Sequence, residues 1–379
     1  MRHPDTNQQA NATKVTCGCC ISRRHVLAGA AAFAASAVDP FPKALAQTPS
    51  GQTSAGQTSA QAPSPATATP APPFRIDVHH HLTPPDYITA VHGKATIPPP
   101  SANWTVNKTL DDMDAAAVQT AILSISTPGL WFGDANAAAK LARGCNEYAA
   151  KLALENKGRF GSFAALPLPN ADAALGEISY ALDTLKADGV LVFTSYEGKW
   201  LGDAVFVPVF EELNRRKAIV SVHPTTAACC GNLIPYIPDN VVEFGTDTTR
   251  TIASLIFSGA AERWPDIKFI FSHAGGTMPF LIERFEFLAR MPQAAKMLPN
   301  GVRTPLQRFF YDTAQASNPA AMGALRQLVE PTQIVFGTDF PYRTSIEHVN
   351  NLAGCKILAP DLRKIERDNA LGLLPRLRA

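Results

Sequence analysis

The chain has 379 residues, of which 46% are hydrophobic, and its formal net charge at pH 7 is +2. This near-neutral balance, with no basic stripe along the chain, argues against nucleic acid as a partner. The four cysteines that follow residue 73 are too few for a fold held together by disulfide bonds.

Residues 1–46 have the order of a bacterial export signal. Arg23 and Arg24 precede an Ala-rich apolar stretch, residues 26–38, and Ala44-Leu45-Ala46 supplies a small-residue cleavage site. The paired arginines indicate the twin-arginine route, and the protein is therefore expected to be periplasmic or secreted. The apolar stretch is too short for stable membrane insertion. Cleavage after Ala35-Ser36-Ala37 is an alternative.

Residues 47–73 consist of Ser, Thr, Ala, Pro, Gln and Gly, without any charge or large apolar side chain. Because such a segment has nothing to bury, it is predicted to be a disordered linker. The remaining residues, 74–379, number roughly 300, which suits one α/β barrel better than two small domains.

Short apolar runs alternate with helix-like stretches from residue 74 onward. Most of the runs are almost continuously apolar, as expected for parallel strands that are buried on both faces. Eight such alternations predict a (β/α)8 TIM barrel. An open doubly wound sheet is the alternative, but no Gly-rich turn follows the first strand. The predicted strands are 74–81, 120–126, 160–168, 189–195, 219–224, 268–275, 309–314 and 334–341, and the predicted helices are 136–154, 171–186, 205–216, 249–263, 278–289 and 319–328.

Polar residues stand at the ends of four of these strands. His79 and His81 end the first, and His223, His273 and Asp339 lie towards the ends of the fifth, the sixth and the eighth. The active site of such a barrel lies at the carboxyl ends of its strands. Nitrogen ligands and one carboxylate from separate strands suit a catalytic ion such as Zn²⁺, with Mn²⁺ as the alternative.

The neighbours of these histidines have other predicted roles. His80 points to the opposite face of its strand and is expected to be structural. Asp77 shares the face of His79 and His81. It is expected either to bind the metal or to support a metal ligand through a hydrogen bond. No lysine ends the fourth strand, 189–195.

The chain closely resembles the amidohydrolase superfamily. Within it, the chain is similar to the branch typified by 2-amino-3-carboxymuconate-6-semialdehyde decarboxylase, and in particular to its 6-methylsalicylate decarboxylase-like members. The resemblance spans nearly all of residues 74–377. The segments that carry it are 76–81, 158–167, 222–224, 272–276, 337–341 and 368–370, and the closer likeness lies in 127–132 and 223–230.

This resemblance implies a single metal ion, because the end of the fourth strand lacks the lysine of the family's two-metal members. It also implies roles for individual residues. His79, His81, His223 and Asp339 match the metal ligands of the family, and His273 matches its catalytic histidine. Asp339 is also a candidate proton donor, and which of the two residues donates stays open.

Two further residues are assigned to the substrate. By resemblance, Arg284 binds a substrate carboxylate, across the dimer interface in some members, which implies a homodimer. Trp131 is a candidate for stacking on an aromatic ring. Cys229 and Cys230 are expected to remain reduced and to pack as small apolar side chains.

The predicted function is that of a metal-dependent non-oxidative decarboxylase, a carboxy-lyase. Its substrate would be a small aromatic acid, of the hydroxybenzoate or 6-methylsalicylate type, or a muconate-like carboxylic acid. The alternative is a metal-dependent hydrolase of a lactone or an amide, since the same ligands serve both reactions. A non-catalytic binding protein is the other class considered, and the intact set of ligands argues against it.

Overall fold

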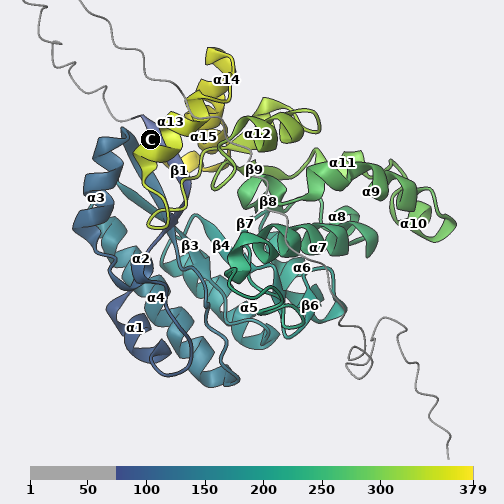
Figure 1. Ribbon diagram of the computed structural model, residues 1–379. Helices are drawn as coiled ribbons and strands as arrows, with labels where there is room; N and C mark the ends of the chain where they lie inside the picture. Colours follow the sequence, from purple (N-terminus) through teal and green to yellow (C-terminus); the bar gives the residue numbers. More distant parts are fainter. Residues whose placement is uncertain (1–73, 379) are drawn as a thin grey trace, which may run out of the picture. The chain divides into compact units, whose positions relative to one another are not determined.

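The computed structural model describes residues 74–378 of the chain (Figure 1). The predicted signal peptide, 1–46, and the predicted linker, 47–73, lie outside the described residues. Within residues 74–378, no helix is both long enough and apolar enough to cross a membrane.

Eight parallel strands form one sheet in the order β1-β2-β3-β4-β7-β8-β9-β10. Each strand pairs with the next one in this order, so the sheet winds around in a single direction. All eight predicted strands are present in the predicted sequence order. The strands are β1 (Arg75–His81), β2 (Val118–Ser124), β3 (Phe160–Ala165), β4 (Gly189–Phe193), β7 (Ile219–His223), β8 (Lys268–Phe271), β9 (Phe310–Asp312) and β10 (Ile334–Val335).

The first strand meets the segment that follows the last one. Val78 N donates to Phe336 O at 2.9 Å, and Asp339 N donates to His79 O at 2.9 Å. A parallel bridge also joins His80 to the chain just beyond Asp339. These contacts make a nearly closed barrel, and the prediction of a single-domain α/β barrel is confirmed. They also place Asp339 beside β1.

Helices connect successive strands, as parallel pairing requires. The segments between β1 and β2 and after β10 are also helical, which the sequence pattern did not indicate. A two-stranded hairpin, β5 (Ser195–Tyr196) with β6 (Lys199–Trp200), follows β4. The α-helices are α1 (Pro85–Val91), α2 (Pro99–Ala102), α3 (Val106–Ala115), α4 (Ala135–Glu155), α5 (Ala171–Ser179), α6 (Val207–Arg215), α7 (Glu243–Phe257), α8 (Ala260–Arg263), α9 (Ile282–Ala289), α10 (Pro292–Met297), α11 (Arg303–Leu306), α12 (Pro319–Arg326), α13 (Ser345–Ala353), α14 (Ala359–Arg363) and α15 (Asn369–Leu373).

Several predicted boundaries differ from the structure. The sixth strand ends at Phe271 and the eighth at Val335, both earlier than predicted. Beyond these ends, His273 and Asp339 have left-handed backbones with φ of 56° and 68°, through which a strand cannot continue. Helix α7 starts at Glu243, before the predicted residue 249. His273 and Asp339 both have predicted functional roles.

Aromatic side chains pack the region between β8 and β9. Phe271 lies 5.0 Å from Phe309 and 5.8 Å from Phe269 between ring centroids, and all three rings are buried. Complete burial of such a side chain contributes roughly 1.5–3 kcal/mol. This packing holds the two strands whose carboxyl ends carry His273 and Asp312.

Gly337 allows the last strand to approach the first. A Cβ atom at this position would lie 2.7 Å from the Cβ atom of His79 and 3.1 Å from that of Asp312. Real Cβ atoms do not come so close, so any other residue here would displace its neighbours. The absence of a side chain at Gly337 therefore sets the distance between β1 and the loop that carries Asp339.

Candidate metal centre

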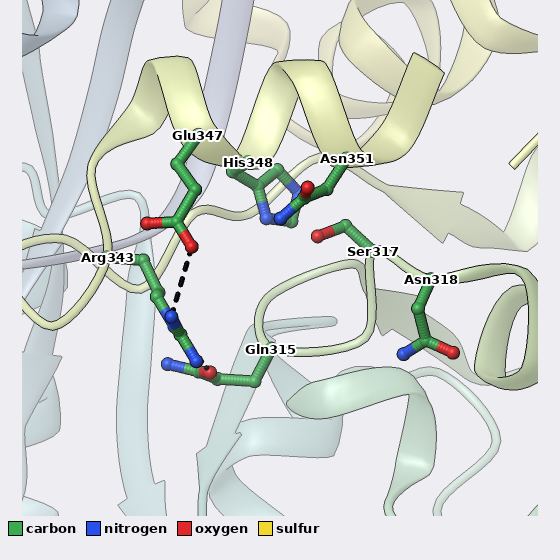
Figure 2. Close-up of a pocket in the computed structure, with 7 residues that line it drawn as sticks. All are labelled: Gln315, Ser317, Asn318, Arg343, Glu347, His348 and Asn351. Carbon is green, nitrogen blue, oxygen red and sulfur yellow. Dashed lines mark hydrogen bonds and ion pairs between the residues drawn. The ribbon is translucent and has the colours of Figure 1, made fainter. Parts of the chain in front are cut away.

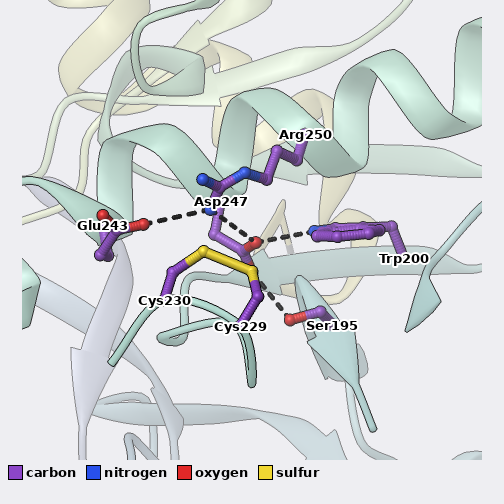
Figure 3. The surroundings of a disulfide bond; sticks show 7 residues. All are labelled: Ser195, Trp200, Cys229, Cys230, Glu243, Asp247 and Arg250. Atoms are coloured by element: carbon purple, nitrogen blue, oxygen red, sulfur yellow. Dashed lines mark hydrogen bonds and ion pairs between the residues drawn. A yellow bond between two sulfur atoms is a disulfide. The ribbon is translucent and has the colours of Figure 1, made fainter. Parts of the chain in front are cut away.

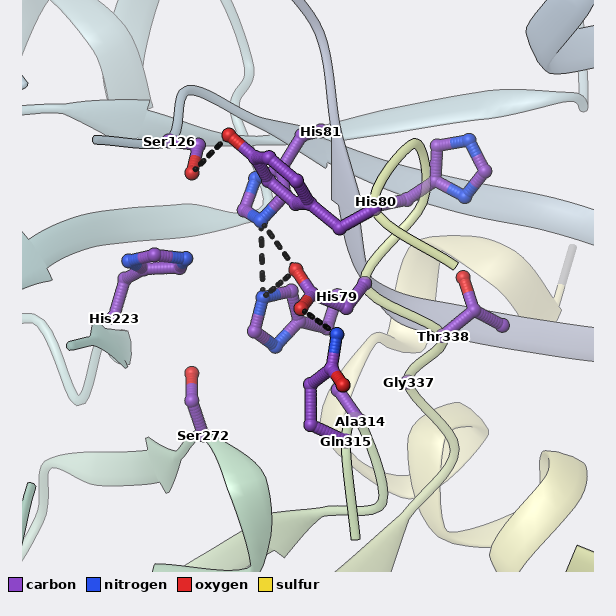
Figure 4. A network of polar contacts seen from close by, with 12 residues as sticks. His79, His80, His81, Ser126, His223, Ser272, Ala314, Gln315, Gly337 and Thr338 are labelled. Atoms are coloured by element: carbon purple, nitrogen blue, oxygen red, sulfur yellow. Dashed lines mark hydrogen bonds and ion pairs between the residues drawn. The ribbon is translucent and has the colours of Figure 1, made fainter. Parts of the chain in front are cut away.

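Three histidines and one aspartate meet at the carboxyl end of the barrel. Figure 4 shows the three histidines, His79, His81 and His223. His79 and His81 are two residues apart on β1 and leave the same face of that strand. His223 is the last residue of β7, and Asp339 follows β10. One ligand atom from each residue lies within 4.8 Å of the others, and all four residues are buried. The structure thus brings together the four residues that were expected to bind metal.

The Nδ1 atom of each histidine in this group faces an oxygen acceptor. His79 Nδ1 lies 2.7 Å from Asp312 Oδ2, and His81 Nδ1 lies 3.2 Å from a carbonyl oxygen of β2. His223 Nδ1 lies 2.7 Å from the carbonyl oxygen of Pro224. An imidazole that donates its Nδ1 hydrogen and is neutral keeps an Nε2 lone pair for a metal ion.

The Nε2 atoms of His79 and His81 lie close enough to each other, and to Asp339, to share one cation. His79 Nε2 and His81 Nε2 are 3.1 Å apart, and Asp339 Oδ1 lies 3.3 Å and 3.0 Å from them. Two nitrogen lone pairs at this distance repel each other unless a proton or a cation lies between them. The donor set therefore fits a divalent metal ion.

The electrostatic environment also favours positive charge at this point. Burial opposes a charged imidazole, but Asp312 and Asp339 outweigh it and raise the pKa of His79 to about 10. Burial lowers the pKa of His81 and lowers that of His223 well below its usual range. Burial alone would raise the pKa of Asp339, but the neighbouring imidazoles hold it well below its usual range. Metal binding would displace the proton on His79.

His273 lies beside the cluster, directly after β8. Its ring stacks on that of His79, with centroids 5.3 Å apart and planes 9° from parallel. Its backbone N–H donates to Asp312 Oδ1 at 2.9 Å. Its Nε2 is buried, has no hydrogen-bond partner within residues 74–378, and lies 3.6 Å from Asp339 Oδ2. This nitrogen is placed to exchange a proton with a group bound at the cluster.

Two residues near the end of β9 belong to the site but were not singled out from the sequence. Asp312 accepts hydrogen bonds from both His79 and His273. Gln315 Nε2 donates to Asp339 Oδ2 at 2.8 Å. The acidic residue inside the apolar run 309–314 was a signal that could have identified Asp312, whereas no local pattern marks Gln315.

Three residues of the centre have a left-handed backbone. Gln315 has a φ of 53°, close to those of His273 and Asp339. Each left-handed residue other than glycine costs on the order of 1–3 kcal/mol and persists only where the surroundings enforce it. All three of these residues carry a side chain that takes part in the network around Asp339.

Asp77 supports the centre and is not one of the grouped ligands. Its Oδ1 accepts from the backbone N–H groups of His79 and Thr338, at 2.9 Å and 3.2 Å. Its Oδ2 lies 2.9 Å from His80 Nδ1. Asp77 therefore uses both oxygens to tie β1 to the loop that carries Asp339. His80 points away from the cluster, and its ring stacks on Phe340.

The structure places the two predicted substrate residues away from the grouped ligands. Arg284 is exposed on α9 and forms no ion pair within the described part of the chain. Trp131 is half-buried in the loop after β2, and its indole N–H donates to Glu197 Oε1 at 3.1 Å. Neither side chain contacts a metal-ligand candidate within one chain.

Aromatic rings from separate segments surround the cluster. Phe193, the last residue of β4, lies 5.7 Å from His223 between ring centroids, and Phe244 lies 6.2 Å from His223. Tyr342 approaches His81 at 5.8 Å. The polar centre is therefore bordered by flat apolar surfaces, on which an aromatic ring can pack.

Cys229 and Cys230 form a disulfide bond in the loop after β7 (Figure 3). The prediction that both remain reduced was wrong; a tight turn in this loop brings the two neighbouring sulfur atoms together. Close by, the buried carboxylate of Asp247 accepts hydrogen bonds from Ser195 and Trp200, which anchors α7 to the hairpin. The other two cysteines in residues 74–378 are free and buried.

The model of the amidohydrolase family matches residues 76–376. The chain belongs to the amidohydrolase family. The decarboxylase yanB of Aspergillus niger is 40% identical to this amidohydrolase over 324 residues, which cover 80% of the chain and 88% of that protein. The 6-methylsalicylic acid decarboxylase of Penicillium expansum is 36% identical over 318 residues, which cover 80% of the chain and 97% of that protein. The resemblance found in the sequence motifs is confirmed.

The fold is also found in a crystal structure of dihydroxybenzoic acid decarboxylase from Polaromonas, determined with bound manganese and the inhibitor 2-nitroresorcinol. The two structures agree with a TM-score of 0.68, over 81% of this chain and 98% of that one, at 21% sequence identity. At this identity the likeness shows the shared barrel alone.

Replacement of His223 by alanine is expected to remove the metal from this amidohydrolase and leave the barrel folded, because the side chain lies at the end of β7 and points into the centre. Metal content after purification and circular dichroism would measure the two effects. His92→Ala, at an exposed position after α1, should keep its metal and serves as the control. Full metal occupancy in the His223 variant would exclude this residue from the site.

Proposed function

We propose that this amidohydrolase is a metal-dependent, non-oxidative decarboxylase of a small aromatic carboxylic acid of the hydroxybenzoate or 6-methylsalicylate type. The observation that carries the proposal is the buried group of His79, His81, His223 and Asp339, with His273 stacked beside it. Relatives at 40% and 36% identity that are decarboxylases support this reaction class. A muconate-like acid is the alternative substrate.

The centre would hold a single divalent ion. Zn²⁺ is the ion that we expect, because three imidazoles and one carboxylate are ligands that it prefers. Mn²⁺ is the alternative, and it is the ion bound by the Polaromonas enzyme. When bound, the ion would hold the carboxylate of the acid together with an adjacent oxygen, such as an ortho-hydroxyl, and neutralise their charge.

The protein must supply one proton for each CO₂ that is released. Decarboxylation breaks the bond between the ring carbon and the carboxylate, and a new bond between that carbon and hydrogen replaces it. His273 Nε2 and Asp339 Oδ2 are the two atoms that can deliver this proton, and they lie 3.6 Å apart. Addition of the proton to the ring carbon interrupts the aromaticity of the ring, and loss of CO₂ restores it. The donor then recovers a proton from solvent.

The surroundings of the cluster suit an aromatic acid. Phe193, Phe244 and Tyr342 supply aromatic surface close to His223 and His81. Trp131 is proposed to extend this surface from the loop after β2, where its hydrogen bond to the β5–β6 turn holds the indole in place. Flat apolar walls also exclude water from the ring carbon that receives the proton.

The metal-loaded protein is expected to release CO₂ from at least one member of a panel of hydroxybenzoates that includes 6-methylsalicylate. The protein stripped by a chelator should release none, because the carboxylate then has no ion to hold it. The evolved CO₂ and the phenol product would be measured together. Opening of a lactone or cleavage of an amide, without any CO₂, would favour the hydrolase instead.

Replacement of His273 by alanine should keep the metal and lower the rate of CO₂ release by about 10²–10⁴-fold, the usual contribution of a placed proton-transfer group. Metal content and kcat would be measured on the same preparation. A variant that turns over at the rate of the parent would leave His273 with a structural role only.

Arg284 is proposed to bind the substrate carboxylate in the site of a second copy of the chain. Phe287 lies three residues after Arg284 on α9, so the two side chains share one side of that helix, and Phe280 lies in the short turn just before it. The two phenylalanines are 70% and 62% exposed, and Leu288 and Met291 are exposed beside them. Exposed apolar residues of this size are typical of an interface. A two-fold contact through α9 would give each site one arginine from its partner.

A mixture of Arg284→Ala and His273→Ala subunits is expected to recover part of the activity that each variant lacks, because some mixed dimers contain one complete site. The rate of CO₂ release would be compared before and after subunit exchange. Labelled subunits would verify that exchange has occurred. If exchange proceeds and no activity returns, Arg284 does not act across an interface.

A further inference from the structure

Gln315 connects Asp339 to the surface of the protein. The residue follows β9, and its left-handed backbone turns the side chain towards the loop after β10. Its Nε2 donates to Asp339 Oδ2 at 2.8 Å, and its Oε1 accepts from Arg343 Nε at 3.2 Å. Arg343 Nη1 also donates to Glu347 Oε1 at 3.0 Å. These four side chains form a continuous chain of hydrogen bonds that starts at the metal centre.

The orientation of the Gln315 amide follows from its partners. An arginine side chain can only donate hydrogen bonds, so the amide oxygen must face Arg343. The amide nitrogen is then left to face Asp339 and donates to it. Arg343 therefore fixes which end of the amide meets the carboxylate.

The two oxygens of Asp339 have different neighbours as a result. Oδ1 lies 3.0 Å from His81 Nε2 and 3.3 Å from His79 Nε2, on the metal side. Oδ2 lies 2.8 Å from Gln315 Nε2 and 3.6 Å from His273 Nε2, on the side of the proton-transfer group. Rotation of the carboxylate would exchange these roles, and the hydrogen bond from Gln315 opposes that rotation.

A cavity of about 180 Å³ lies beside this chain of hydrogen bonds (Figure 2). Gln315, Arg343 and Glu347 line it, together with polar side chains from the loop after β9 and from α13. Glu347 lies on α13 one helical turn after Arg343, and Thr344 caps the same helix, so the arginine is held at a defined helix start. The arginine that orients the Gln315 amide is thus held at the start of a helix rather than in a free loop.

We propose that Gln315 is a positioning residue of the metal centre. Oriented by Arg343, its amide holds the Asp339 carboxylate with Oδ1 towards the metal and Oδ2 towards His273. The importance of this arrangement for turnover rests on the proposed decarboxylation, whereas its effect on the metal site does not. Gln315 acts through Asp339, whose Oδ2 accepts its hydrogen bond, and donates no proton to the substrate itself.

The test uses Gln315→Met, which keeps the length of the side chain and removes both hydrogen bonds, in the full-length protein. Co²⁺ replaces the native ion, because its visible absorption spectrum reports the geometry of its ligands. The spectrum and the dissociation constant for Co²⁺ are measured without substrate, and kcat and KM are measured with it. Ser317→Ala, at another residue that lines the cavity, is the matched control.

Gln315→Met is expected to shift the Co²⁺ spectrum and to lower metal affinity or kcat by roughly 10–100-fold, the usual effect of losing a residue that orients a metal ligand. KM should change far less. Gln315→Glu, which keeps the acceptor for Arg343 but places a carboxylate against Asp339, should have at least as large an effect. A spectrum, affinity and kcat within twofold of the parent in both variants would overturn the proposal.

Arg343→Met distinguishes an arginine that acts through Gln315 from an arginine that contacts the substrate directly. If Arg343 acts through Gln315, the substitution weakens the parent but has no further effect in the Gln315→Met variant. A further rise in KM in the double variant would show that Arg343 contacts the substrate directly, and would overturn its assigned role. If the parent releases no CO₂ from any acid tested, the proposed reaction fails, and the Co²⁺ spectrum and affinity alone decide the role of Gln315.

Discussion

The carboxylate of Asp312 links the two parts of the centre. One oxygen accepts from His79 Nδ1, and the other accepts from the backbone N–H groups of His273 and Ala314. Asp312 is 1% exposed, so these donors replace the water that a buried carboxylate loses. The contact with His79 also directs its Nε2 towards the other ligands. One side chain at the end of β9 therefore orients a metal ligand and holds the candidate acid–base histidine against it.

The metal centre also depends on a close approach between the first and last strands of the barrel. Asp77 and Gly337 act together at the junction between the first and last strands. Asp77 hydrogen-bonds both to β1 and to Thr338, while the missing side chain of Gly337 leaves room for His79. Without this close approach, the ligands of β1 and the ligand after β10 could not reach the same ion. The strained backbone of Asp339 is kept in place by the same contacts.

A barrel of this kind supports many reactions, and the loops decide among them. In this protein the loops bring aromatic rings to the rim of a polar centre, and they contain a disulfide bond between neighbouring cysteines. The α9 segment adds exposed aromatic residues around Arg284, outside the metal centre of its own chain. The candidate metal ligands and His273 therefore lie within one barrel, whereas Arg284 lies outside the metal centre of its own chain.

The sequence alone determined the number and order of the strands, because parallel strands buried on both faces appear as continuous apolar runs. It also determined that His79 and His81 share a face, since side chains alternate along a strand. The tertiary structure alone decided the roles of Asp312 and Gln315: His79 and Asp312 are 233 positions apart, and no local pattern records that two strands end side by side. It likewise decided the turns at His273 and Asp339 and the pairing of Cys229 with Cys230. Periodicity reports how one element is buried, whereas these contacts depend on how the ends of several strands converge when the barrel closes.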